Sequence, residues 1–125
     1  MFEDVCAQHL WELSRQGALP SRYDRIGGWW RGDREVNLVP VSDDGRVLLG
    51  ECKWSENPVG TDILDGLVAK AAAVAAEANA TEIHFAIWSR AGFTPALKDI
   101  ARKRGVMLFE AADIAAQEAT PRGTP

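Results

Sequence analysis

The sequence is poor in the residues that mark several large classes of protein. Its 125 residues include only two cysteines and two histidines, and 14 Lys and Arg residues are outnumbered by 18 Asp and Glu residues. Cys6 and Cys52 share no metal-ligand spacing, and His9 and His84 are too scattered to complete a zinc site. No Gly-x-x-x-x-Gly-Lys-Ser/Thr loop is present, so the chain contains no ATPase motor.

Long hydrophobic runs are also missing. No apolar stretch approaches the roughly 20 residues that a membrane-spanning helix needs. The first four residues, Met-Phe-Glu-Asp, lack the basic start and the apolar stretch of a secretory signal. Both cysteines lie on apolar faces of predicted elements, which favours buried, reduced thiols over a disulfide. We therefore expect a cytoplasmic protein with no membrane partner.

The composition is that of an ordinary globular domain, with 46% hydrophobic and 26% charged residues. This length suits one domain with one hydrophobic core. We expect a single domain over residues 1–116, followed by a flexible tail over residues 117–125. The net charge of −4 argues against a nucleic-acid-binding surface that covers the whole molecule, so any contact with DNA would be local.

Apolar periodicity predicts an alternation of helices and strands along the chain. Helices are expected at 2–17, at 61–78 with Thr61 or Asp62 as the cap, and at 95–104, and strands at 22–30, 36–41, 46–54, 83–88 and 106–109. The long helix is expected to bury a stripe that includes Leu64, Leu67 and Val68. The order α-β-β-β-α-β-α-β predicts an α/β fold, a three-layer sandwich around a mixed sheet.

The stretch 37–54 is the most informative part of the chain, because an apolar hairpin there ends in Glu51-Cys52-Lys53. Strand alternation puts the Glu51 and Lys53 side chains on one face and Cys52 on the other. An acid and an amine side by side on a core strand cost free energy unless they are paired or hold a metal. Chemistry is therefore expected here.

The turn of this hairpin decides which residue lies across from Glu51. A three-residue loop that ends with Gly45 in the left-handed region places Asn37 directly opposite Glu51. A two-residue Asp44-Gly45 turn would instead place Cys52 opposite Asn37. We prefer the first register because it gathers the polar side chains on one face.

Three blocks of sequence carry a family resemblance. They are residues 26–30 (Ile-Gly-Gly-Trp-Trp), 34–39 (Arg-Glu-Val-Asn-Leu-Val) and 50–55 (Gly-Glu-Cys-Lys-Trp-Ser). With the acid-bearing first helix, they resemble the core of the PD-(D/E)XK nuclease superfamily over about residues 2–113. The closest branch is the poorly characterised domain at the C-terminal end of archaeal-type ATPases, which also occur in bacteria. The resemblance implies a restriction-endonuclease-like core.

The resemblance also implies roles for individual residues. Glu51 and the backbone carbonyl of Cys52 would hold one or two magnesium or manganese ions, and Lys53 would position the attacking water. Glu3 would be a further ligand, direct or through water, unless it is an exposed helix acid. Asn37 stands where the family usually has a metal-binding Asp, so it offers only a neutral oxygen and magnesium binding should weaken.

Two functions from different classes follow. The first is a metal-dependent DNA endonuclease that hydrolyses phosphodiesters, impaired by Asn37. The second is an inactive nuclease-fold module for DNA binding, or for assembly with an ATPase domain in cis or in trans or with itself as a homodimer. The first requires Glu51, Lys53 and Asn37 to converge on one pocket at the sheet's edge, near the first helix. The second is favoured by the tryptophans Trp29 and Trp30, because alternation exposes at least one of them for docking to a protein partner.

Overall fold

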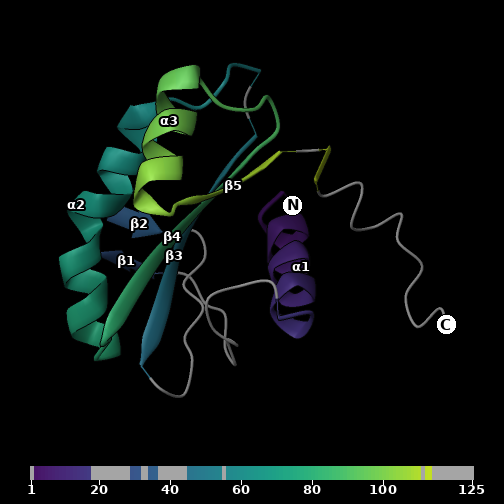
Figure 1. Ribbon diagram of the computed structural model, residues 1–125. Coiled ribbons are helices and arrows are strands. Elements are labelled where there is room, and N and C mark those ends of the chain that lie inside the picture. The colour runs from purple at the N-terminus through teal and green to yellow at the C-terminus, as the bar shows by residue number, and fades with distance from the viewer. Residues whose placement is uncertain are drawn as a thin grey trace, which may run out of the picture.

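The computed structural model describes residues 2–17, 29–31, 34–36, 45–54, 56–110 and 112–113, with the backbone alone for 2–4, 29–31, 34–36, 77 and 78. Along this part of the chain the elements follow the predicted order α-β-β-β-α-β-α-β (Figure 1). They are α1 (Phe2–Arg15), β1 (Trp29–Arg31), β2 (Arg34–Val36), β3 (Arg46–Lys53), α2 (Thr61–Ala78), β4 (Glu82–Ser89), α3 (Pro95–Arg104) and β5 (Met107–Glu110).

The centre of the fold is a parallel sheet in which β4 lies between β3 and β5. β3 and β4 pair along their whole length, from Arg46↔Glu82 to Lys53↔Ser89. The connecting helices α2 and α3 lie on one side of this sheet and α1 lies on the other (Figure 1). Successive crossovers of the same hand place their helices on the same face of a parallel sheet. The α/β prediction and its three layers are confirmed for these elements.

The antiparallel part of the prediction is described only in part. β1 and β2 pair with each other, from Trp29↔Val36 to Arg31↔Arg34. Within the described ranges this pair is a sheet of its own, separate from β3, β4 and β5. The rest of the expected strands 22–30 and 36–41, and the hairpin pairing across from β3, lie outside the described residues. The single mixed sheet and both hairpin registers therefore stay predictions, although Gly45 does have the expected left-handed backbone, with φ of 84°.

One half of the core lies between the sheet and the helices α2 and α3. Leu64, Leu67 and Val74 of α2 pack on alternate residues of β3, including Val47 and Leu49. These positions follow the three- and four-residue steps of one helix face. Val68 was expected in the same stripe, but it is 42% exposed, so that assignment was wrong. Val68 directly follows Leu67 and lies at the edge of the buried stripe, where the helix surface turns toward solvent.

The other half of the core lies under α1, where Cys6 and Leu10 pack against Leu48 and Trp88. The Trp88 Nε1–H donates a hydrogen bond of 2.9 Å to Nδ1 of His9, and both residues are buried. This bond satisfies an indole N–H that would otherwise be buried without a partner. The predictions that His9 is a core histidine and that Cys6 is a buried free thiol are confirmed, whereas Cys52, which was also expected to be buried, is only half-buried.

The helix ends show which caps the sequence specified. The Thr94 hydroxyl accepts a hydrogen bond of 3.3 Å from the Leu97 N–H, as expected for a cap before a proline, and α3 stops at Gly105 with φ of 71°. For α2 the expected cap was wrong. Its N-cap is Gly60, with no side-chain bond, because the preceding Val59 is held in a parallel bridge with Phe93 that fixes where the helix starts.

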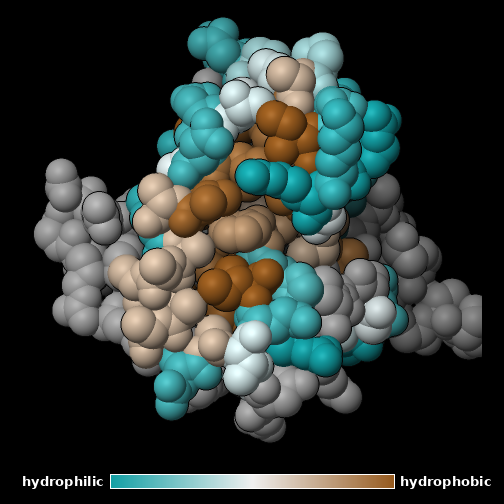
Figure 2. Space-filling view, turned by 60° about the vertical axis from the view of Figure 1, so that its left-hand side comes forward, coloured by the Kyte–Doolittle hydropathy of each residue, from teal (hydrophilic) through white to brown (hydrophobic). Residues whose placement is uncertain are grey.

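The outer face of α2 carries few charges. Figure 2 brings this side forward and shows brown and tan residues gathered at its centre, bordered by hydrophilic ones. Val68 and the alanines Ala69, Ala72 and Ala76 are exposed along the helix. In the described ranges, no helix combines the length with the apolar character needed to cross a bilayer.

Replacing His9 should destabilise the domain strongly. In His9→Ala the cavity and the unpaired Trp88 N–H should together lower the free energy of unfolding by roughly 2–4 kcal/mol. The matched control is His84→Ala, which removes a partly exposed ring bonded to Glu82 and should cost about 0.5 kcal/mol or less. Urea unfolding would measure both variants, and equal losses would contradict the assigned role of His9.

Ser89 should behave in the opposite way. Its hydroxyl is buried and has no hydrogen-bond partner among the residues that the structure describes. Because a buried unpaired hydroxyl costs desolvation, Ser89→Ala should raise the free energy of unfolding by about 1 kcal/mol. Thr94→Ala, which removes a hydroxyl that caps a helix, should lower it by about 1 kcal/mol. A Ser89→Ala variant less stable than the wild type would show that this hydroxyl is satisfied in solution.

Candidate functional site

The Glu51 and Lys53 side chains lie on the same face of β3, at its carboxyl end. Val47 and Leu49 pack toward α2 and α3, so alternation puts Glu51 and Lys53 on that side too. Cys52 packs on the opposite side with the residues that contact α1. The predicted separation of faces is confirmed. Glu51 and Lys53 do not lie on the face that α1 covers. The pocket that was expected near the first helix could therefore reach α1 only around the end of the sheet.

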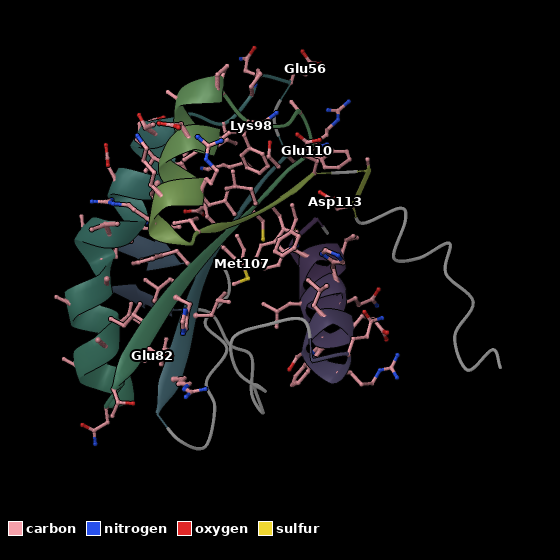
Figure 3. The ribbon with its side chains drawn as sticks, in the orientation of Figure 1. Glu56, Glu82, Lys98, Met107, Glu110 and Asp113 are labelled. Atoms are coloured by element: carbon pink, nitrogen blue, oxygen red, sulfur yellow. The ribbon has the colours of Figure 1, made fainter. Side chains whose placement is uncertain are left out.

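A polar row crosses the sheet at this end. Lys53 is in register with Ser89, and Ser89 is in register with Glu110 of β5. Parallel pairing puts these three side chains on the same face, since registered neighbours point the same way. Figure 3 labels Glu110 at the end of β5, with Asp113 close behind it. The carboxyl ends of three parallel strands, where ligands of α/β folds usually bind, therefore carry polar groups in this protein.

The loops after β3 and β4 are tied together at this end. The Arg90 N–H donates a hydrogen bond of 3.1 Å to the Lys53 carbonyl. The Val59 N–H then bonds to the Gly92 carbonyl at 2.9 Å. Gly92 has φ of 86°, and a Cβ there would come within 3.0 Å of Oε1 of Glu110. The backbone of this loop is therefore packed closely against the Glu110 carboxylate.

An aromatic and cationic pair extends the site outward. Trp54 directly follows Lys53 and is 63% exposed. The guanidinium carbon of Arg90 lies 4.6 Å from the centroid of the Trp54 ring, a distance typical of a cation–π contact. Trp54 and Arg90 thus follow the strand ends that Lys53 and Ser89 occupy.

Two of the expected site residues are not described at the level of side chains. Asn37 lies outside the described residues, so its place opposite Glu51 stays a prediction. Glu3 is in the first turn of α1, and Figure 1 shows that this helix begins at the end of the molecule where β5 finishes. The backbone therefore brings residue 3 to the same end of the sheet as Glu51, and its role as a ligand is also a prediction.

The described donors fit a divalent cation only in part. Glu51 and the Cys52 carbonyl offer the hard oxygen atoms that magnesium and manganese prefer. Over the ranges for which side chains are described, no group of three or more His, Cys, Asp or Glu residues is arranged to hold a metal. A complete site would need oxygens from Asn37 and Glu3, and the ammonium group of Lys53 on the same strand face offsets the charge of Glu51.

Some polar residues at this end were not singled out from the sequence. Ser89, Arg90 and Glu110 follow or end apolar strands, and such positions carry function often enough to be a usable signal. This signal is weak in the sequence alone, because the spacing of these residues along the chain does not show which strands are neighbours in the sheet.

Three comparisons place the chain among known proteins. The solved structure "Structure of EndoMS-dsDNA2 complex" is similar with a TM-score of 0.49 and 12% sequence identity, over 86% of this chain and 43% of that one. The uncharacterized protein MJECL04 of Methanocaldococcus jannaschii is 35% identical over 57 residues. That alignment covers 45% of this chain but only 13% of the relative, which is therefore much the longer protein.

A family model matches more than half of the chain. The match runs over residues 1–72, from α1 through β3 and into α2, and so includes Glu51, Cys52 and Lys53. The family, DUF234, is described as archaea bacterial proteins of unknown function. The chain belongs to this family.

Proposed function

We propose that the domain is a metal-dependent phosphodiesterase of the PD-(D/E)XK type that acts on DNA, with its activity lowered by Asn37. The observation that carries the proposal is the half-buried pair Glu51 and Lys53, side by side at the carboxyl end of β3. The restriction-endonuclease-like core belongs to the same proposal, supported by the confirmed element order and by the sequence blocks around this pair.

The two side chains have complementary tasks in such a reaction. The Glu51 carboxylate, with the Cys52 carbonyl, would hold a magnesium or manganese ion, which neutralises phosphate charge when bound. The Lys53 ammonium group would donate hydrogen bonds to a phosphate oxygen and orient the attacking water. The water loses a proton to solvent as its oxygen forms a bond to phosphorus, the bond from phosphorus to the leaving oxygen breaks, and that oxygen takes up a proton from solvent.

Asn37 would set how tightly such a site binds a divalent cation. An amide oxygen in place of a carboxylate removes one negative charge from the ligand set, and cation affinity follows ligand charge. Lys53, held on the same face as Glu51, adds a positive charge that opposes cation binding. The proposed enzyme is thus a weak one that a single added charge would strengthen.

Nicking of a supercoiled plasmid would test the catalytic assignment. In manganese, Glu51→Ala and Lys53→Ala should each lower the nicking rate by about 100-fold or more, because each removes an electrostatic contact to the reacting group. The matched controls are Glu56→Ala and Lys98→Ala, an exposed acid and an exposed lysine outside the pair (Figure 3). Equal nicking by all four variants would assign the cleavage to a contaminant and would refute the proposal.

Metal binding gives a test that does not depend on cleavage. Isothermal titration with manganese should show at least about tenfold tighter binding for Asn37→Asp than for the wild type, since the variant restores a charged ligand. Glu51→Ala should abolish the binding, and Glu56→Ala should leave it unchanged. If Asn37→Asp binds manganese no better than the wild type, residue 37 does not face the metal site.

The inactive module is the second candidate, and the observation that favours it is Asn37 itself. It predicts that neither the wild type nor Asn37→Asp nicks DNA at any manganese concentration, while the fold stays intact. DNA binding, assembly with an ATPase domain and formation of a homodimer all belong to this second proposal.

A further inference from the structure

We propose that Trp54 and Arg90 form a platform on which an unpaired base stacks, so that the ligand of the neighbouring site is single-stranded or locally unpaired nucleic acid. The inference deepens the proposed function and rests on it for the role of the adjacent Glu51 and Lys53. It identifies the class of nucleic acid that this end of the sheet would bind.

The geometry of the pair suits stacking. The indole of Trp54 is 63% exposed, although a tryptophan side chain offers a large apolar surface for burial. The Arg90 guanidinium carbon, 4.6 Å from the ring centroid, helps to hold the indole in place, so that little side-chain freedom remains to be lost on binding. Proteins stack the bases of single strands on exposed aromatic rings, and Arg side chains contribute to the same surfaces.

The backbone fixes the platform relative to the site. Trp54 is the residue after Lys53, and Arg90 is the residue after Ser89, which is in register with Lys53. The hydrogen bond of 3.1 Å from the Arg90 N–H to the Lys53 carbonyl holds the two segments that carry Trp54 and Arg90 side by side. By strand alternation Trp54 and Arg90 continue the face of Cys52 and Trp88. The phosphate of a nucleotide whose base lies on Trp54 would therefore have to pass around the carboxyl end of β3 to meet Lys53.

Charge distinguishes this mode from binding to a duplex. Among the described residues that end or follow these strands, Lys53 and Arg90 bring positive charge, whereas Glu51, Glu110 and Asp113 bring negative charge. The whole chain is also acidic, with a net charge of −4. A long series of phosphate contacts along a duplex is thus disfavoured, and stacking must supply much of the affinity. Stacking needs an exposed base face, which paired and stacked DNA does not offer.

Fluorescence anisotropy with labelled oligonucleotides, in EDTA so that no cleavage occurs, would test the inference. The wild type should bind a single-stranded thymidine oligomer more tightly than a duplex of the same length. Trp54→Ala should weaken the single-strand affinity about 5- to 150-fold, the effect of losing one stacked base. Trp54→Phe should recover most of the affinity, and Arg90→Lys should lose part of it although the charge is kept.

The matched control is Trp11→Ala, which removes another exposed indole, 41% accessible, from helix α1. This variant should bind like the wild type. Two phosphate contacts should give a salt slope of about −1.4 or shallower in a plot of log affinity against log salt. A steep slope, a preference for duplex, or equal affinities of Trp54→Ala and wild type would overturn the inference.

The outcomes separate this inference from the proposed function. If binding falls in Trp54→Ala but no variant nicks DNA, the platform stands and the phosphodiesterase proposal falls. If the wild type nicks DNA and Trp54→Ala binds and nicks equally well, the platform falls and the phosphodiesterase proposal stands. Light scattering that shows a wild-type dimer, lost in Trp54→Ala and with no oligonucleotide binding, would make the surface a protein interface and would also overturn the inference.

Discussion

The packing of one central strand, β4, on both of its faces holds the described fold together. Its last four residues are buried, and it pairs with β3 on one side and β5 on the other. Ile87 joins the core under α2 and α3, and Trp88 joins the core under α1. Since a strand buried on both sides must fill space and satisfy polar groups in both directions, the bond from Trp88 to His9 is as much part of the core as the apolar contacts.

The same strand determines where chemistry can occur. Because β3, β4 and β5 are parallel, their carboxyl ends meet at one edge, and the polar residues that end each strand are collected there. Lys53, Ser89 and Glu110 come from three separate segments and form one row. The bond between the Arg90 N–H and the Lys53 carbonyl ties the following loops to that row. Polar residues that lie far apart in the sequence are thus brought together at one edge of the sheet.

Most of the elements could be predicted from local patterns. The helix that starts at Phe2, the strand from Arg46 and the helix that stops before Gly105 agree with apolar periodicity and turn residues. Two predictions were wrong, the burial of Val68 and the N-cap of α2, because local patterns do not include contacts between distant segments. Val68 has the helical spacing of a core residue, yet its side chain is 42% exposed at the edge of the buried stripe. Gly60 begins α2 in place of Thr61 or Asp62, because the bridge between Val59 and Phe93 sets the start of the helix.

The sequence by itself determined that Glu51 and Lys53 share one face and that Cys52 takes the other, because alternation along a strand is a property of the local backbone. It also determined the order of helices and strands, and the match of residues 1–72 to the family model. The tertiary structure decided which strands are neighbours. It therefore decided that Ser89 and Glu110 extend the row of Lys53 and that Arg90 lies over Trp54. These pairings depend on the register between β3, β4 and β5, which are separated in the chain by the helices α2 and α3. The spacing of residues along the chain does not determine that register.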